Sequence, residues 1–423
     1  MFLEAFGNYR KLKKSQWWET EKLLSLQWSR FKEILKFSYD NVPFYKEAFD
    51  DAGITPHDIK VYSDLVKLPT CDKNDLRAAF PDKWLAKTYS ASDCSEAVTS
   101  GSTGDPLKFY IDKGSLAFRF AVNMRTLEIS DYHLGHKLFQ VSPPVSGKLN
   151  SGFKEKLINT VLRRTVVPPF ETDIENKFHQ LASFKPKAIV GYTSYIKSLA
   201  DMSKQLDEKV RIPVIMTTSE MLLPETRKDI EETFGGKVFD QYGSVEMGRM
   251  SAQCNAGDGY HINAESVLVE VIGRDGKHAK PGEEGELICT NLMNYTTPFI
   301  RYKVGDFGTI LEKQCSCGRG LPLMGEIGGR LNDIITTPSG KKIMPEYFYL
   351  TLREIKGLNQ FQVVQTSAST LKILYTPEEG FDEARRIESE TQYKEYLKDM
   401  TVSWEKVKEI KKISGKHKHI ISL

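Results

Sequence analysis

The stretch Lys237-Val-Phe-Asp-Gln-Tyr-Gly-Ser-Val-Glu246 passes from a short apolar run into a polar segment rich in small residues. Two similar apolar runs lie upstream at 188–190 and 214–216, and the intervening residues have helical patterns at 195–206 and 224–234. Short buried strands that alternate with helices predict a sheet covered by helices. The fold class expected from this region is α/β.

Two polar segments directly follow strands of the predicted sheet. Thr217-Thr-Ser-Glu220 comes after the run at 214–216, and Gln241-Tyr-Gly-Ser-Val-Glu246 comes after the run at 237–239. Ligands of α/β proteins bind outside the carboxyl ends of strands. We therefore expect both segments at one ligand-binding edge.

The remaining segments predict the domain organisation. Apolar residues at helical spacing predict a helix over 15–37, with Ser15 and Glu19 at its start. β-Branched residues and turns predict antiparallel strands near 266–328. We expect a large domain of residues 1–330, which includes a helical N-terminal segment, and a small α+β domain of residues 331–423. The residues that predict the helix are Trp17, Leu24, Trp28, Phe31 and Leu35.

The composition limits the class of protein. The chain has 423 residues, 40% hydrophobic and 27% charged, which is too long for one ordinary core. A formal net charge of +3 gives no bulk attraction to nucleic acid or to an anionic membrane. No apolar run approaches the roughly 20 residues of a membrane helix, and the first residues do not read as a signal peptide. We expect a cytoplasmic protein with no nucleic-acid partner and no membrane span, and leave a homodimer open.

The segment Thr99-Ser-Gly-Ser-Thr-Gly-Asp-Pro106 has the composition of a phosphate-binding loop. Its glycines let backbone amides approach an anion, and its hydroxyl groups can donate hydrogen bonds to phosphate oxygens. It lacks the Gly-Lys-Ser/Thr sequence of the loop in mononucleotide hydrolases. Taken alone, the segment is equally well explained as a surface turn.

Further segments complete a specific combination. In chain order the set is Thr99-Ser-Gly-Ser-Thr-Gly104, Tyr242-Gly-x-x-Glu246, Arg301-Tyr-x-x-Gly-Asp306, Gly329-Arg330 and Ser414-Gly-Lys416. This set resembles the acyl-adenylate-forming superfamily of acyl-CoA synthetases, peptide-synthetase adenylation domains and luciferase. Tyr39-Asp-Asn-Val-Pro-Phe-Tyr45 and Cys315-Ser-Cys-Gly-Arg319 make the chain most similar to the phenylacetate-CoA ligase group, which includes ligases of capsule biosynthesis. The resemblance covers essentially the whole chain and implies a large multi-sheet AMP-binding domain with a small mobile α+β C-terminal domain.

The resemblance also implies that ATP and Mg²⁺ bind to the large domain. Glu246 would hold Mg²⁺, a hard cation that prefers carboxylate and phosphate oxygens. Asp306 would accept hydrogen bonds from the ribose hydroxyls, and the ring of Tyr242 would stack on adenine. The residues implied to contact the nucleotide are Thr99, Ser100, Gly101, Ser102, Thr103, Gly104, Ser219, Glu220, Gln241, Tyr242, Gly243, Ser244, Asp306 and Arg330.

Lys416 matches the lysine of the small mobile domain in that family. It would place a positive charge where negative charge accumulates, at the α-phosphate and the acyl carboxylate. The catalytic residues implied are therefore Lys416 and Glu246. Residues 405–419 hold six lysines, so a solvated basic tail is the alternative explanation of this residue.

The implied reaction has two steps. A carboxylate attacks the α-phosphorus of Mg·ATP to give acyl-AMP and pyrophosphate, and a nucleophile then attacks the acyl carbon and releases AMP. The acceptor is CoA in one hypothesis and an amine or hydroxyl group of surface-polysaccharide or secondary-metabolite biosynthesis in the other.

A noncatalytic nucleotide-binding relative is the alternative from another class. It stays open because Asp105 and Asn332 stand where many members carry lysine and aspartate, respectively. Lys108 is a candidate replacement for the missing lysine.

The resemblance would place the acyl group near residues 140–145, 191–195 and 247–250. Large side chains in and beside these segments indicate an apolar or aromatic acid, with ordinary core packing as the alternative. The sequence does not specify the acid. The side chains in question are Phe139, Tyr192, Tyr195 and Met247.

Four residues independently suggest a metal site. Cys254, His261, Cys315 and Cys317 offer three thiolates and one imidazole, which is a tetrahedral set for structural Zn²⁺. The alternative is reduced cysteines beside an unrelated histidine. The other cysteines are predicted to be packing residues, because six in this length are too few for a disulfide framework. They are Cys71, Cys94 and Cys289.

Overall fold

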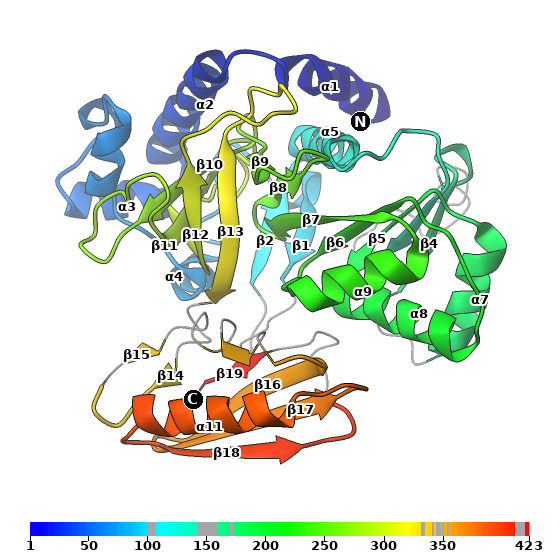
Figure 1. Cartoon of the computed structure of the whole chain (residues 1–423). Coiled ribbons are helices and arrows are strands. Elements are labelled where there is room, and N and C mark those ends of the chain that lie inside the picture. The colour runs from blue at the N-terminus through cyan, green and yellow to red at the C-terminus, as the bar shows by residue number, and fades with distance from the viewer. Residues whose placement is uncertain are drawn as a thin grey trace.

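The computed structural model describes residues 1–99, 107–142, 159–168, 173–330, 335–340, 342–343, 348, 351–352, 355–410 and 419–422. Within these residues, a larger body contains an 11-stranded sheet and a smaller body contains a four-stranded sheet with a helix packed on it (Figure 1). The predicted α/β class is confirmed. None of the described helices is both long and apolar enough to cross a membrane.

The large sheet joins a parallel half to an antiparallel half. The parallel strands are β3 (Leu138–Val141), β4 (Arg164–Val167), β5 (Ala188–Tyr192), β6 (Val214–Thr218) and β7 (Lys237–Ser244). The antiparallel strands are β8 (Gly248–Gln253), β9 (Tyr260–Ile262), β10 (Val267–Ile272), β11 (Gly285–Asn291), β12 (Tyr302–Leu311) and β13 (Leu323–Arg330). Their order is β10-β11-β12-β13-β9-β8-β7-β6-β5-β3-β4. Because β7 pairs parallel with β6 and antiparallel with β8, the two halves meet at this strand.

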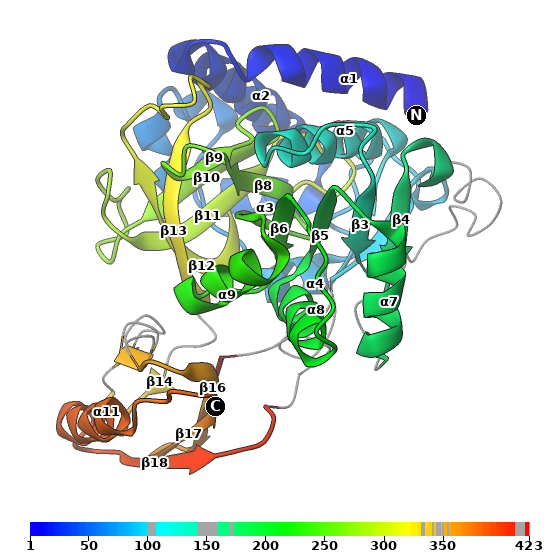
Figure 2. The same ribbon diagram turned by 45° about the vertical axis from the view of Figure 1, so that its right-hand side comes forward.

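The predicted strands at 188–190, 214–216 and 237–239 are confirmed as β5, β6 and β7. The predicted helices are α8 (Thr193–Gln205) and α9 (Pro224–Phe234), and α7 (Ile174–Phe184) lies beside α8 (Figure 2). Successive strand residues face opposite sides. Ile189 and Ile215 pack in the cluster that includes α7–α9, whereas Val190 and Met216 pack in a second cluster with Leu127 of α5 (Lys113–Ile129).

The antiparallel strands predicted near 266–328 are present and continue the same sheet. Aromatic residues of the N-terminal segment fix the chain just before β12. The Tyr45 hydroxyl donates to the Pro298 carbonyl (2.8 Å) and accepts from the Ile300 amide (2.9 Å), and the Trp84 indole donates to Pro298 (2.7 Å). The other elements of this region are α3 (Pro43–Asp51), α4 (Lys73–Ala79), β1 (Ser95–Val98), β2 (Lys108–Ile111) and the 3₁₀ helices Pro56–Asp58, Tyr62–Lys67 and Ala91–Asp93.

The single helix predicted over 15–37 is wrong in its bounds. The chain forms α1 (Phe2–Ser15) and α2 (Thr20–Asn41) instead. Between them, the Gln16 carbonyl accepts a hydrogen bond from the Gly320 amide (3.0 Å), and the Thr20 hydroxyl donates to the Gly320 carbonyl (2.9 Å). The Gln16 carbonyl and the Thr20 hydroxyl thus bond to a distant loop, so a tertiary contact overrides the helical pattern.

The buried face of α2 also differs from the predicted one. Trp17 lies in the junction and is 52% exposed, and Leu24 is 44% exposed. The face packed on the sheet contains Leu23, Phe31 and Ile34, each fully buried. The prediction that Phe31 faces the core is therefore correct. At the start of α2 the buried residue is Leu23, one position before the predicted Leu24.

The smaller body has its own core. Its sheet order is β18-β17-β16-β19, and α11 packs over it (Figure 1). Buried Phe361, Ile373 and Tyr393 belong to this core, and Met221 and Leu223 from the larger body pack against it. The elements are β14 (Ile335–Thr336), β15 (Lys342–Ile343), β16 (Leu358–Ser367), β17 (Thr370–Pro377), α11 (Glu383–Tyr396), β18 (Thr401–Lys406) and β19 (Ile420–Ile421).

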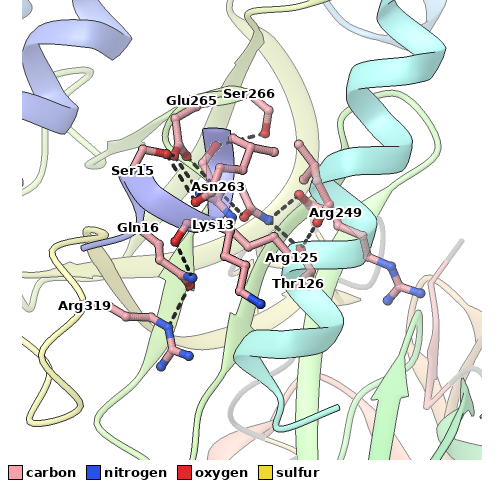
Figure 3. Close-up of polar contacts among 12 residues, drawn as sticks. Lys13, Ser15, Gln16, Arg125, Thr126, Arg249, Asn263, Glu265, Ser266 and Arg319 are labelled. Atoms are coloured by element: carbon pink, nitrogen blue, oxygen red, sulfur yellow. Dashed lines mark hydrogen bonds and ion pairs between the residues drawn. The ribbon is translucent and has the colours of Figure 1, made fainter. Parts of the chain in front are cut away.

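A buried ion pair joins α5 to the loop before β10 (Figure 3). The Arg125 guanidinium donates to both carboxylate oxygens of Glu265, at 2.6 and 2.8 Å, and to the Asn263 side-chain oxygen at 2.5 Å. Arg125 is 0% exposed and Glu265 is 1% exposed. Burial alone would raise the pKa of Glu265, but the contact with Arg125 holds it below its usual range.

The same carboxylate also holds the N-terminal helix. The Ser15 hydroxyl donates to Glu265 Oε1 at 2.6 Å. On the other side, the Asn263 amide donates to the Thr126 hydroxyl and to the Arg249 carbonyl, each at 2.9 Å. The network therefore fixes α1, α5 and β8 relative to one another.

Replacing Arg125 by methionine is expected to lower the free energy of unfolding by about 3–5 kcal/mol, because Glu265 would remain buried without its counter-charge. Urea unfolding of the full chain measures this. The matched control is Lys36→Met, which removes the exposed pair of Lys36 with Asp40 and should cost less than about 1 kcal/mol. Equal effects of the two substitutions would contradict a special role for the buried pair.

Candidate nucleotide site and metal cluster

The hairpin between β7 and β8 forms the first wall of the candidate site. A Cβ atom on Gly243 would lie 2.2 Å from the Gly248 carbonyl oxygen, so this position requires glycine. The Ser244 hydroxyl accepts a hydrogen bond from the Met247 amide at 3.1 Å. These contacts fix the backbone that carries the half-buried Glu246.

Two phenols link the hairpin to β12. The Tyr242 hydroxyl donates to Asp306 Oδ2 at 2.8 Å, and the Tyr302 hydroxyl donates to Glu246 Oε1 at 3.1 Å. Burial and the Glu246 carboxylate raise the pKa of Tyr302, so its hydroxyl remains a donor at neutral pH. The structure thus brings the predicted Tyr242, Glu246 and Asp306 together across strands that are not neighbours in the sheet.

The strand next to β12 carries another predicted residue. Asp306 and Arg330 are opposed in the β12–β13 register, although the side chain of Arg330 lies outside the described part of the structure. Arg301, from the same motif as Asp306, is 3% exposed and pairs with Glu270 at 3.0 Å. Arg301 is therefore a structural member of the motif.

The ends of β6 and β7 place three more predicted residues. Ser219 is exposed and has a φ of 69°, a conformation that non-glycine residues rarely adopt outside strained or functional positions. The Glu220 carboxylate accepts hydrogen bonds from the amide (2.7 Å) and hydroxyl (3.0 Å) of Ser194 in α8. Gln241 is buried and bonds to Ser130 and Arg249 through its side chain. The side chains of Glu220 and Gln241 therefore have structural partners.

Several predicted residues lie outside the described part of the chain. They are Ser100, Gly101, Ser102, Thr103, Gly104, Asp105, Asn332 and Lys416. Thr99 is described, and its hydroxyl accepts a hydrogen bond from the Leu107 amide at 2.9 Å. Lys108 is exposed and lies 3.8 Å from Glu96.

The sequence did not identify two arginines beside the hairpin. Arg249 donates to the Thr218 hydroxyl (2.9 Å) and to the Gln241 side chain (2.7 Å). Arg119 of α5 packs against Gly248 and makes no hydrogen bond or ion pair within the described residues. Burial lowers the pKa of both guanidinium groups, which indicates poor solvation. The sequence signal that could have identified Arg119 is a positively charged residue within the segment of α5, most of which is buried.

The large side chains predicted near the acyl group belong mainly to cores. Phe139 and Tyr195 are 0% and 2% exposed and pack in the cluster with α7–α9, as does Tyr192. This favours the core-packing alternative for them. Met247 lines a small cavity together with Glu246.

The predicted metal ligands converge. The ligand atoms of the four residues all lie within 4.8 Å of one another, with Cys254 Sγ 3.5 Å from Cys315 Sγ and Cys317 Sγ 3.3 Å from His261 Nε2. Burial lowers the pKa of His261 to about 4, so its imidazole is neutral at physiological pH. The other cysteines are free, and Cys71 and Cys289 are buried in a hydrophobic core.

Comparison with known proteins gives relatives along most of the chain, although no protein-family model matches. A phenylacetate-coenzyme A ligase of Thermus thermophilus is 28% identical over 361 residues, which are 83% of this chain and 80% of the relative. Protein CapK of Staphylococcus aureus is 28% identical over 310 residues, covering 70% of this chain and 65% of CapK. Over most of its length the chain is therefore similar to phenylacetate-coenzyme A ligases and to CapK, and through them to the acyl-adenylate-forming enzymes.

A solved structure shows the same fold along almost the whole chain. It is a 2-hydroxyisobutyryl-CoA ligase in the postadenylation state, with a TM-score of 0.77, 22% identity, and coverage of 95% of this chain and 89% of that chain. The shared fold therefore extends over both bodies.

Gly243→Ala is expected to destabilise the protein by about 1–3 kcal/mol, because the added methyl group overlaps the Gly248 carbonyl. Gly7→Ala is the control, since a Cβ on Gly7 of α1 meets no atom within 4 Å and should stabilise the helix by about 0.5–1 kcal/mol. Thermal unfolding of both variants compares them. A Gly243→Ala variant as stable as the parent would refute the close-approach argument.

Proposed function

We propose that the protein converts a carboxylic acid into its acyl-adenylate with Mg·ATP and then transfers the acyl group to coenzyme A. The observation that carries this proposal is the pair of carboxylates, Glu246 and Asp306, each bonded to a phenol at the junction of the two sheet halves. The similarity of most of the chain to ligases named for coenzyme A supports the reaction class.

In this proposal, Asp306 binds the ribose hydroxyls and Tyr242 stacks on adenine while its hydroxyl orients Asp306. Tyr302 bonds to one oxygen of Glu246, which leaves the second oxygen to ligate Mg²⁺. The hard oxygen donor fits this cation, whose chemistry is to neutralise charge on the phosphates. Arg330 assists from the strand beside Asp306. Backbone groups near Ser219, Glu220, Gln241, Gly243 and Ser244 complete the nucleotide contacts, and residues 99–104 bind the β- and γ-phosphates.

The chemistry needs positioning and charge neutralisation rather than an acid–base pair. An oxygen of the substrate carboxylate attacks the α-phosphorus, and the bond to pyrophosphate breaks. The thiolate of coenzyme A then attacks the acyl carbon, and AMP leaves with the electrons of the cleaved C–O bond. Lys416 supplies the positive charge in the first step, from a domain of residues 331–423 that follows the large domain of residues 1–330.

Lys416→Ala should reduce carboxylate-dependent exchange of labelled pyrophosphate into ATP by about 10²–10³-fold, the loss typical of a preorganised charged donor. The control is Lys408→Ala, which removes an exposed lysine eight residues earlier and should retain the rate. Equal rates in the two variants would support the alternative of a solvated tail.

Coenzyme A should accelerate AMP release once an active acid has been found by pyrophosphate exchange. The acid panel should include acids with polar substituents, because Arg119 and Arg249 lie near the hairpin. AMP release that depends on an aminosugar or alcohol instead of coenzyme A would favour the second hypothesis, direct transfer to an amine or hydroxyl group. Absence of exchange with every acid would favour a noncatalytic nucleotide-binding protein.

A further inference from the structure

The Cys/His cluster is assembled by the sheet from three separate parts of the chain. Cys254 directly follows β8, His261 lies in β9, and Cys315 and Cys317 lie in the loop between β12 and β13. The register pairs His261 with Ala252 of β8 on one side and with Leu323 of β13 on the other. The strand pairing therefore places the imidazole between the two cysteine-bearing segments.

The spacing of the donor atoms fits a tetrahedral ion. Zinc–sulfur bonds of about 2.3 Å and zinc–nitrogen bonds of about 2.0 Å place donors roughly 3.5–3.8 Å apart in a tetrahedron. The observed pairs at 3.5 and 3.3 Å are close to this spacing, and all four atoms lie within 4.8 Å. Four protein ligands leave no open coordination position, which is the pattern of a structural site.

Ordinary packing does not account for this convergence. Cys71 and Cys289 show how a buried thiol packs here without a metal, since both lie in one apolar cluster and neither belongs to the group of four converging side chains. A disulfide between Cys254 and Cys315 would use two thiols and leave Cys317 beside His261 without a role. One ion uses all four side chains.

The ligand loop also has a support outside the cluster. Ser316 lies between Cys315 and Cys317. Its amide (2.8 Å) and its hydroxyl (2.7 Å) both donate hydrogen bonds to the Asp258 carboxylate. Metal sites commonly have such carboxylates behind their ligands.

The far end of this loop holds the junction between α1 and α2. The Gly320 amide donates to the Gln16 carbonyl, and the Gly320 carbonyl accepts from the Thr20 hydroxyl. The Arg319 guanidinium donates to the Gln16 side chain at 2.9 Å (Figure 3). A Cβ on Gly320 would lie 1.8 Å from the Trp18 carbonyl oxygen, so the two backbones are in direct contact. Whatever fixes residues 315–320 therefore also fixes the N-terminal helices.

We propose that Cys254, His261, Cys315 and Cys317 bind one structural Zn²⁺, and that this ion locks the loop 315–320 onto the α1–α2 junction. The site is separate from the residues assigned to nucleotide binding, and the proposal does not depend on the reaction. It predicts that the junction between α1 and α2 is held in place only when the metal is bound.

Metal analysis of the purified full chain should give about one zinc per molecule. The Cys254→Ser and Cys317→Ser variants should each contain at least tenfold less zinc than the parent. The control is Cys94→Ser, which replaces a half-buried cysteine outside the cluster and should leave the zinc content unchanged. Asp258→Asn keeps all four ligands and should weaken zinc binding about 10–100-fold in a competition titration with a chelator. The same titration with Zn²⁺ alone tests the parent protein.

Hydrogen exchange reports the structural role and does not require the cysteine variants to fold. Removing the metal from the parent protein with a chelator should increase exchange at the Gly320 and Ser316 amides and in the first turns of α2, and adding Zn²⁺ should reverse this. Cobalt substitution should give the absorption of a tetrahedral thiolate site.

The proposal is overturned if the parent chain neither contains zinc nor binds added Zn²⁺, or if mass spectrometry finds a Cys254–Cys315 disulfide in the active protein. It is also overturned if Cys94→Ser loses as much zinc as Cys254→Ser. Zinc binding without any change in exchange at Gly320 would refute the locking role.

Discussion

The bidentate contact between Arg125 and Glu265 is the constraint on which the larger body depends. Neither charge is exposed to solvent, so each is tolerable only because the other is present. The partners of this pair extend to Ser15, Asn263 and, through Asn263, to the backbone of Arg249. Helices α1 and α5 and strand β8 of the β7–β8 hairpin therefore share one electrostatic anchor.

That anchor lies behind the candidate site rather than in it. Arg249 contributes its carbonyl to the anchored network, while its side chain bonds to Gln241 and Thr218 at the strand ends. The hairpin is thus held on one side by the buried network and on the other by the side chain of Arg249. Rigid support of this kind is what preorganised binding of a polyanion requires.

The parts of the fold that follow from local pattern were predicted correctly. Short apolar runs gave β5, β6 and β7, and helical spacing gave α8 and α9 with nearly the observed bounds. The break between α1 and α2 could not be predicted, because it is imposed by Gly320, some 300 residues away. The motifs gave roles to Tyr242, Glu246 and Asp306, whereas Tyr302 stood in a motif without a role, because its contact with Glu246 depends on how the sheet brings β12 to the hairpin. The metal cluster was accessible because cysteine and histidine are chemically distinctive, whereas the register that assembles it was not.

The contact between the two bodies has a mechanical consequence. Met221 and Leu223 pack against the core of the smaller body, and they lie in the same short segment as Ser219 and Glu220 at the end of β6. Only one residue separates Ser219 from Met221, so a backbone displacement at one reaches the other through covalent bonds alone. The segment after β6 therefore joins Ser219 and Glu220 of the candidate site directly to the residues on which the smaller body packs.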